Sequence, residues 1–539
     1  MKMLQFPCFD VIIVGARLDS IILARMLAEA GVRVLLTDAG SSLPSDYVQA
    51  LQFTISHKTI NELPELLRTV FAESGYPGRL NLMSLSIKTE NYLLDTGVQL
   101  LYEVMPTGLL AFDGKCTGLV LGGAYGLASV PAAVVVDASD NGKLVAAMNG
   151  IKPGLPKEWS LTGVLAPVKN NLYNNPDLKE RADDIMAEDC VKTSVKLDTC
   201  PPDLRLSRQG RRDYAAEKMA ESAEKLGRRL ERVASISLEH NMQIKTTSPI
   251  DGLISISPVD GVFEQVMAYL ADSTAAVNAE SASVVWLVPD GITSKAMISE
   301  LPVRLMVSDF QFTEPGVSVS EIAAPPLPEA GKVELVVVGG GTSGVPAAIK
   351  AAGLGVSTIL IEKYMDLGGT NTIGGVAKYW FGRWTPYFSR YYRQLKTAVL
   401  QSQLPMPFVL RDLCTAEGVE VSTGTLCVGT FVEQHHTDSH VTGVVLLNEE
   451  GIRVVPASFA IDATGDGHLA AMSGVPYSYG AERDDMTYWA SFGSFHHGSA
   501  VSSRQYHSVV DSRSARDVTR GIIAGRRQPG IFGTGSIPA

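Results

Sequence analysis

The feature that most constrains the fold is a repeat. Two stretches about 325 residues apart each hold an apolar run ending in glycine, a helix-like segment, and a second apolar run ending in an acid. The glycines are Gly15 and Gly339, and the acids are Asp38 and Glu362, so the acid follows the glycine at the same spacing in both copies. A strand, a helix and a strand in this order are typical of a βαβ unit in a parallel sheet.

Two further matches keep the same offset. Thr117–Leu121 resembles Thr442–Leu446, and Val136–Met148 resembles Ile461–Met472. One glycine loop can match by chance, whereas several matches in constant register across about 140 residues indicate tandem copies of one fold. The two copies are therefore expected to be related α/β domains.

The glycine loop of the second copy follows the pattern GxGxxG. Gly339 permits a tight turn, Gly341 lets the backbone approach a pyrophosphate, and Gly344 lets the helix pack closely on the strand. The amides that follow, including those of Thr342 and Ser343, would point at the phosphates from the helix N-terminus. The pattern predicts a dinucleotide site.

The acid at the end of the second strand narrows the choice of dinucleotide. A carboxylate at Glu362 can accept hydrogen bonds from ribose hydroxyls and disfavours a 2′-phosphate, which speaks against NADP. Lys363 and the glycine-rich Leu367–Gly375 follow at once, and Phe459–Gly467 is a strand that runs into another glycine turn. A simple NAD domain does not need these extra backbone approaches, although a flexible connection would also explain the first of them.

Together these motifs resemble the FAD-dependent oxidoreductases with a glutathione-reductase-type Rossmann domain, particularly the fumarate-reductase-like branch. The resemblance is good over residues 333–475 and faint over 9–150. It implies extended FAD as cofactor and a β-meander over Val419–Val455. The resemblance implies that the loop glycines contact the pyrophosphate and that Glu362 contacts the ribose. Gly368, Gly369 and Thr370 would lie along the pyrophosphate and the ribityl chain. Thr464, Gly465 and Asp466 would close the adenosine side of the pocket.

The first copy departs from the motif where phosphate should bind. Arg17 and Ser20 replace the second and third glycines, and Asp19 adds negative charge beside them. No glycine-rich passage follows Asp38. We expect a retained fold with a lost or much altered cofactor site.

The predicted fold class is α/β, with tandem Rossmann-like FAD/NAD(P)-binding folds, small β-meander insertions and an intervening α+β region. Within the intervening region we expect one helix from Arg205 to Val233. The predicted divisions are a degenerate Rossmann-like domain (1–150), a cap or substrate-type region (151–312), a Pro-rich linker (313–331), the FAD-binding domain (332–475) and the start of a substrate-type region (476–539).

The second copy is short, since only 64 residues follow Val475. In the resembling family a substrate-covering domain interrupts the core and a C-terminal segment returns to complete the flavin pocket. The chain would then be a fragment, or another chain or residues 151–330 would supply the missing wall.

Arg383 is the candidate catalytic residue. It lies in an aromatic segment after the second glycine passage, where a guanidinium could bind an anionic substrate group or stabilise reduced flavin. A surface arginine beside core aromatics explains the pattern equally well. His435, His436 and His440 are better explained by a hairpin loop than by a metal site, and His496 and His497 are weaker acid–base candidates.

Composition sets the remaining expectations. A net charge of −11 argues against nucleic-acid binding, and no apolar run is long enough to span a membrane. Six cysteines without a CxxC pair suggest reduced thiols and a cytoplasmic protein without a metal. A homo-oligomer, or a partner chain that completes the pocket, is compatible with the sequence.

We therefore expect an FAD-dependent oxidoreductase that transfers a hydride between a small organic substrate and flavin. Two alternatives stay open. One is a non-catalytic or regulatory subunit that keeps the fold as a scaffold, and the other is a flavoprotein that takes electrons from NAD(P)H.

Overall fold

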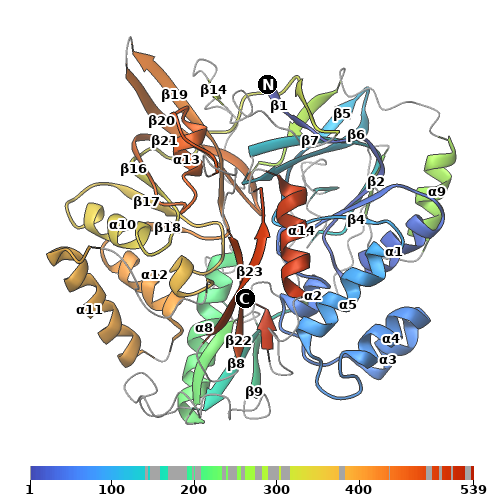
Figure 1. Ribbon diagram of the computed structural model, residues 1–539, viewed down its shortest axis with the longest axis horizontal. Helices are drawn as coiled ribbons and strands as arrows, with labels where there is room; N and C mark the ends of the chain where they lie inside the picture. The colour runs from blue at the N-terminus through green and yellow to red at the C-terminus, as the bar shows by residue number, and fades with distance from the viewer. Residues whose placement is uncertain are drawn as a thin grey trace.

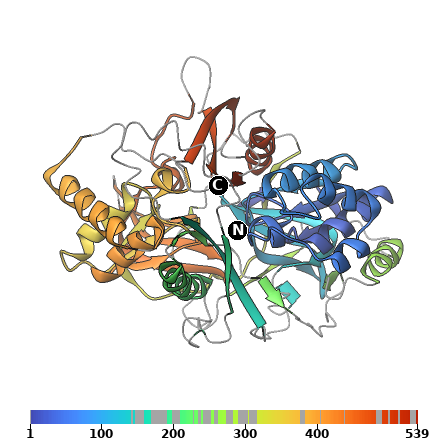
Figure 2. The same cartoon turned by 90° about the horizontal axis from the view of Figure 1, so that it is seen from below.

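The structure of the chain is a computed structural model. It describes residues 2–124, 126–139, 144–145, 158–167, 191–196, 200, 208–226, 228–233, 238–240, 252–255, 261–272, 282–288, 303–304, 316–374, 383–402, 404–435, 438–480, 489–496, 501–511, 514–527 and 536–538. Two α/β units lie on opposite sides of the molecule (Figure 1), the first in blue and the second in yellow and orange. The view from below shows the same arrangement (Figure 2).

The first unit is built on a ten-stranded sheet. Its main path contains, in spatial order, β13 (Ser283–Trp286), β5 (Met105–Phe112), β6 (Lys115–Gly123), β7 (Gly126–Asp137), β2 (Phe9–Val14), β3 (Val34–Thr37) and β4 (Gln99–Leu101). Strands β7, β2, β3 and β4 are parallel, whereas β5, β6 and β7 form an antiparallel meander. Its helices are α1 (Leu18–Glu29), α2 (Ser45–Val48), α3 (His57–Glu62), α4 (Glu65–Glu73) and α5 (Leu82–Leu94).

The second unit has a seven-stranded sheet with the same arrangement. Its order is β14 (Val303–Arg304), β19 (Leu426–His435), β20 (Asp438–Asn448), β21 (Gly451–Asp462), β16 (Val333–Val338), β17 (Thr358–Ile361) and β18 (Glu420–Ser422). Its helices are α10 (Gly344–Ala352), α11 (Pro386–Gln401), α12 (Met406–Ala416) and α13 (His468–Met472), with the short η7 (Gly369–Asn371). The predicted strands, the helix after the glycine loop and the β-meander are confirmed.

The two units agree in register as well as in strand order. Val14 pairs with Asp137 in the first unit, and Val338 pairs with Asp462 in the second. Each of these aspartates accepts a hydrogen bond from the amide two residues later and another from the amide eight residues later. The shared geometry is what tandem copies of one fold would produce, and their origin by duplication stays a prediction.

The intervening region contributes to both units. It adds β12 (Leu253–Ser255) and β13 to the first sheet and β14 to the second. It also forms a separate four-stranded sheet and the helices α8 (Arg208–Lys225) and α9 (Val262–Asp272). The strands of that sheet are β8 (Glu158–Pro167), β9 (Val191–Lys196), β10 (Arg228–Val233) and β11 (Leu238–His240).

The predicted long helix over Arg205–Val233 is wrong in its second part. Helix α8 ends at Lys225, and Arg228–Val233 is the strand β10, paired antiparallel with β8. Met219 and Ala223 are fully buried as the helical spacing requires, but Leu226 is 63% exposed. Pairing with β8 outweighs the helical periodicity, because Leu230 is fully buried from the strand.

The Pro-rich segment before the second unit is partly structured. It forms β15 (Ser318–Glu321), which pairs antiparallel with β1 (Lys2–Gln5) at the edge of the first sheet. The carbonyl of Pro325 accepts a hydrogen bond from Nε1 of Trp286 at 2.8 Å. The segment therefore packs on the first unit before the chain enters the second.

The last part of the chain returns to the first unit. Strands β22 (Trp489–His496), β23 (Val501–Val509) and β24 (Ser536–Pro538) form a small sheet, and α14 (Ala515–Arg526) lies beside β4 and α5 (Figure 1). Thr519 accepts a hydrogen bond from the amide of Tyr102 at 2.9 Å. Arg526 forms a buried ion pair with Glu90.

A shared apolar core joins the two units. The meander residues Val428, Phe431 and Leu447 of the second unit pack in one cluster with Leu109 and Leu121 of the first. All five side chains are at most 2% exposed. Burial of this kind stabilises by about 25 cal/mol per Å² of apolar surface, so the two sheets are held as one body.

Candidate functional site

The glycine loop of the second unit has the geometry that the motif predicts. Gly339 has φ +106°, and a Cβ there would lie 2.1 Å from the carbonyl oxygen of Ala463. A Cβ at Gly344 would lie 1.7 Å from the carbonyl oxygen of Gly339. Both positions require glycine, the first for the turn and the second for the close approach of α10 to β16.

Gly341 differs from its neighbours because its surroundings are open. The nearest atom to a Cβ placed there is the Cα of Gly369, at 3.9 Å. Ser343, the N-cap residue of α10, makes no side-chain capping hydrogen bond. The helix N-terminus beside Gly341, Thr342 and Ser343 can therefore take an anion on its amides.

Glu362 lies at the end of β17, against the glycine loop. Its Oε2 accepts a hydrogen bond from the amide of Gly340 at 2.7 Å, and its Oε1 accepts one from the amide of Tyr364 at 2.9 Å. Burial raises the pKa of this carboxyl, and the two amides act in the opposite direction. Each oxygen can accept a second hydrogen bond, as contact with ribose hydroxyls would require.

The second glycine passage packs against the first. The amide of Gly368 donates to the carbonyl of Gly340 at 2.8 Å, and Gly368 has φ +107°. Gly369 begins η7 with φ +53°, facing Gly341. Thr370 is exposed in the same turn. The structure thus brings Gly341 and the predicted residues Gly368, Gly369 and Thr370 to one place.

Thr464 follows β21 and is held internally. It donates its hydroxyl to Asp462 at 2.7 Å and accepts a hydrogen bond from the amide of His468 at 3.0 Å. Gly465 and Asp466 are exposed beyond it. Burial lowers the pKa of His468, and Asp466, with its Oδ2 3.9 Å from Nε2, opposes this shift. The carbonyl of Ala463 under Gly339 joins this turn to the glycine loop.

The same place in the first unit is filled by its own chain. Asp46 on α2 accepts a hydrogen bond at Oδ1 from the amide of Leu18, in the first turn of α1, at 3.2 Å. Asp38 keeps the pattern of Glu362, since it accepts from the amides of Ala16 and Gly40. It also accepts from Nε2 of Gln49 at 2.9 Å. A carboxylate thus lies at the helix N-terminus where the other unit is open.

The sequence pattern did not predict Asp46 and Gln49. The sequence signal is indirect: the stretch after Asp38 carries a short helix with an acid in its first turn instead of a glycine passage. The contact between Leu18 and Asp46 spans 28 residues and is visible only in the folded chain.

Arg383 is exposed two residues before the N-cap of α11, and the aromatic residues before it lie outside the described part. Trp384 is 49% exposed and packs on Phe388 and Tyr392 of α11. No contact of Arg383 with the glycine loops is present among the described residues. Its catalytic role stays a prediction.

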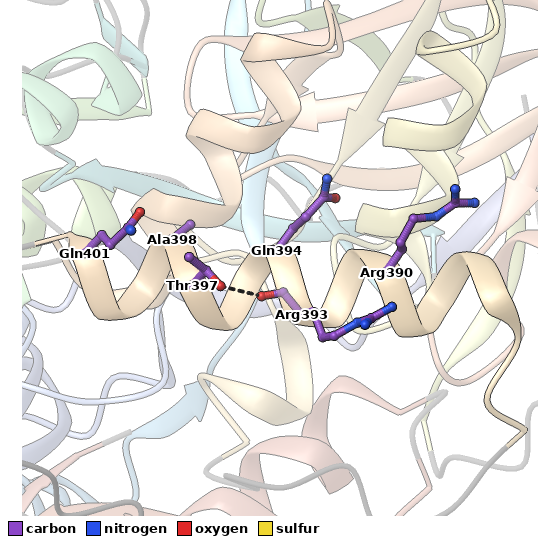
Figure 3. Close-up of a pocket in the computed structure, with 6 residues that line it drawn as sticks. All are labelled: Arg390, Arg393, Gln394, Thr397, Ala398 and Gln401. Carbon is purple, nitrogen blue, oxygen red and sulfur yellow. Dashed lines mark hydrogen bonds between the residues drawn. The ribbon is translucent and has the colours of Figure 1, made fainter.

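A hollow lies along α11 (Figure 3). Six residues line it on one side of the helix, and Thr397 there donates its hydroxyl to the carbonyl of Arg393 at 3.0 Å. They are Arg390, Arg393, Gln394, Thr397, Ala398 and Gln401. None of them was predicted to bind a cofactor.

Part of the chain matches a family known from its sequences. Residues 334–528 match the model of a family described as FAD dependent oxidoreductase. This part of the chain is similar to FAD-dependent oxidoreductases. The matched range takes in the glycine loop, both later glycine turns and α14.

Three solved structures show partial similarity to this chain. CabE, an aromatic hydroxylase from angucycline biosynthesis, has 13% identity and a TM-score of 0.31 over 46% of this chain and 56% of its own. A geranylgeranyl bacteriochlorophyll reductase-like protein from Thermoplasma acidophilum has 13% identity and a TM-score of 0.33. The match covers 49% of this chain and 77% of that protein. THI4 from Thermovibrio ammonificans has 17% identity and a TM-score of 0.21. The match covers 26% of this chain and 61% of THI4. The chain therefore spans 61% of THI4 and 56% of CabE.

The residues present fit FAD. The uncapped N-terminus of α10, the open side of Gly341 and the free accepting capacity of Glu362 suit a pyrophosphate and a ribose. In the second unit those groups would be held by the loop amides and by the Glu362 carboxylate. The sequence expectation of an FAD cofactor agrees with the family.

Metal and membrane features complete the description of the site. No cluster of three His, Cys, Asp or Glu side chains suited to a metal occurs in the part of the chain that the structure describes. His435 ends β19 and His440 lies on β20, at a hairpin, while His436 and His497 lie outside the described residues, as does the side chain of His496. No described helix is both long and apolar enough to cross a bilayer.

The described cysteines are free thiols. They are Cys8, Cys116, Cys200, Cys414 and Cys427. Burial raises the pKa of Cys116, Cys414 and Cys427 to about 12, so these thiols stay protonated and unreactive at neutral pH.

Proposed function

We propose that the chain is an oxidoreductase that transfers a hydride between a small organic substrate and FAD held by the second unit. The observation that carries this proposal is the contrast between two equivalent helix ends. The first turn of α10 is uncapped beside Gly341, whereas the first turn of α1 is capped by Asp46.

The residues of the second unit would divide the cofactor between them. The amides of the α10 N-terminus would bind the pyrophosphate, with Gly369 packed beside Gly341. Glu362 would hold the adenosine ribose, with Lys363 beside it, while Thr464, Gly465 and Asp466 would border the adenosine side. Bound flavin supplies the hydride-accepting chemistry, and the protein orients it and excludes competing reactions.

Arg383 is proposed to bind an anionic group of the substrate. A guanidinium can donate two parallel hydrogen bonds to a carboxylate. Arg383→Lys keeps the charge but loses this geometry, so it should raise KM for an anionic substrate more than it lowers kcat. An unchanged KM in Arg383→Ala would remove Arg383 from the site.

A non-catalytic scaffold is the second candidate function. Contacts of Asp46 and Gln49 at the equivalent place in the first unit favour this function for the N-terminal half of the chain. A cytoplasmic location, and an oligomer or a partner chain that completes the pocket, belong to the proposal in either case. An enzyme and a scaffold differ in whether the bound flavin can be reduced by substrate.

The visible spectrum of the purified chain with added FAD tests the proposal. We expect flavin bands that disappear in Gly341→Asp, because a carboxylate there repels the phosphates while the open surroundings tolerate its Cβ. Gly331→Asp is the matched control, because Gly331 is exposed and has no atom within 4 Å of a Cβ. A colourless protein that ignores FAD would rule out the enzyme.

Substrate oxidation is tested by anaerobic mixing of the FAD-bound chain with small alcohols, amines and hydroxy acids. Bleaching of the flavin by one of them, slowed when the carbon carries deuterium, is the expected result. Bleaching by NADH or NADPH alone would favour the alternative electron source.

A further inference from the structure

The segment between the ribose-binding acid and the pyrophosphate-binding glycines is held by residues of the N-terminal half. This segment, Lys363–Asp366, is called here the bridging segment. It starts directly after Glu362, and only Leu367 separates its end from Gly368. Any displacement of it would move both proposed contacts with the cofactor.

The first unit reaches the bridging segment through Glu103. Its Oε1 accepts a hydrogen bond from the hydroxyl of Tyr364 at 3.1 Å, and its Oε2 lies 3.7 Å from Nζ of Lys363. Glu103 has φ +57°, an unfavourable conformation for a residue with a Cβ. The surrounding contacts hold it there, including donation from its own amide to the carbonyl of Gly40 at 3.1 Å.

Helix α8 of the intervening region reaches the other end of the bridging segment. Arg212, which is 1% exposed, donates from Nη1 to the carbonyl of Met365 at 2.8 Å and from Nη2 to Oδ1 of Asp366 at 2.9 Å. A buried guanidinium is costly unless its donors are satisfied, so these bonds fix its position.

A second arginine, from α12, strengthens this end. Arg411 donates to the same carbonyl of Met365 at 3.3 Å and pairs with Asp213 of α8. Burial and the nearby Arg212 lower the pKa of Arg411 to about 9, so it is still charged at neutral pH. One backbone carbonyl thus receives two guanidinium groups, which restricts its movement.

The restraint extends to the glycine loops. The amide of Gly368 donates to Gly340 at 2.8 Å, and a Cβ on Gly369 would lie 3.0 Å from the Cα of Gly341. Little space separates the two glycine passages, so a shift of Met365 or Asp366 would change the pyrophosphate cradle. In Figure 1, α8 lies between the two units, next to α12.

We propose that Glu103 and Arg212 are positioning residues for the flavin site, so that the N-terminal half braces the cofactor-binding unit without binding a nucleotide itself. The proposal rests on the proposed function, because it assumes that the second unit binds FAD. It also gives the first unit a role that does not depend on its own lost motif.

The test is an FAD titration of the full chain, followed by flavin fluorescence, at a temperature where every variant is folded by circular dichroism. We expect Arg212→Met and Glu103→Ala each to weaken FAD binding roughly tenfold, within the usual range of coupling between sites. The affinity for ADP should fall by the same factor as the affinity for FAD, because the bridging segment lies on the adenosine and pyrophosphate side of the cofactor. Arg212→Lys should recover part of the affinity.

Lys218→Met is the matched control, because Lys218 is a basic residue of the same helix that pairs with Glu221 and is 43% exposed. It should bind FAD as the wild type does. Should Arg212→Met fail to fold, Glu103→Ala tests the same brace from the first unit. Wild-type affinity in the folded variants would overturn the brace alone, whereas a wild-type chain that binds no FAD would overturn the proposed function.

Discussion

At the scale of single residues, the three glycines of one loop have different tasks. Gly344 allows two backbones to touch, because a Cβ there would lie 1.7 Å from the carbonyl oxygen of Gly339. Gly341 has open surroundings, and its lack of a side chain serves the ligand. A stability measurement without cofactor should separate these tasks.

We predict that Gly344→Ala lowers the free energy of unfolding of the apoprotein by about 2–4 kcal/mol, because the backbone must move to relieve the clash. Gly341→Ala should change it by less than about 0.5 kcal/mol, as is usual where nothing is displaced. Urea unfolding of both variants makes the comparison. Equal losses of stability would contradict the separation of tasks.

Asp46 provides a pH-dependent prediction at the same scale. Burial raises the pKa of its carboxyl from 3.8 to about 7 in the folded chain. From about pH 4 to about pH 7 the unfolded chain loses this proton while the folded chain keeps it, so the free energy of unfolding falls as pH rises, and the loss is complete above pH 7.

Asp46→Asn should remove this contribution. The difference in free energy of unfolding between wild type and variant should change across that window by at most about 4 kcal/mol, and by less because the side chain is only partly buried. Urea unfolding at several pH values measures it. A difference independent of pH would show that Asp46 titrates normally.

At the scale of elements, α14 depends on one buried ion pair. Arg526 and Glu90 are 2% and 0% exposed at their side chains, and Tyr102 donates to the same oxygen of Glu90 at 2.9 Å. The helix comes from the end of the chain, whereas Glu90 belongs to α5 of the first unit. The pair therefore fixes part of the family-matched region on the N-terminal unit.

Arg526→Met should lower the free energy of unfolding by about 3–5 kcal/mol, because it leaves a buried carboxylate without its cation. Adding Glu90→Gln should restore much of this loss. Arg527→Met, at the next residue, removes only an exposed hydrogen bond to Asn91 and should cost less than about 0.5 kcal/mol. Thermal or urea unfolding compares the three, and equal effects of the two arginines would contradict the role of the pair.

The elements also show what the sequence could predict. Strands such as Val333–Val338 and the helix after the glycine loop follow from local pattern, because apolar runs and glycine positions are local features. The strand Arg228–Val233 could not be separated from a helix, since its pairing with β8 lies more than sixty residues away. The site was predictable to the same extent. Gly339, Gly341 and Gly344 form a local motif, whereas Asp46, Glu103 and Arg212 act only through contacts across the fold.

At the scale of the whole molecule, two units of the same design have divergent nucleotide sites. In the first unit, Asp46 supplies a carboxylate at the N-terminus of α1, and the side-chain amide of Gln49 donates to Asp38. In the other, both places are open to a ligand, and the loop contacts Glu103 of the first unit and Arg212 of α8.

The stoichiometry of FAD binding tests this division of labour most directly. Titration of the full chain with FAD, measured by calorimetry and by flavin absorbance, should give one FAD per chain, and none in Gly341→Asp. Two FAD per chain, or a single FAD that remains bound in Gly341→Asp, would contradict a closed first unit and an open second one.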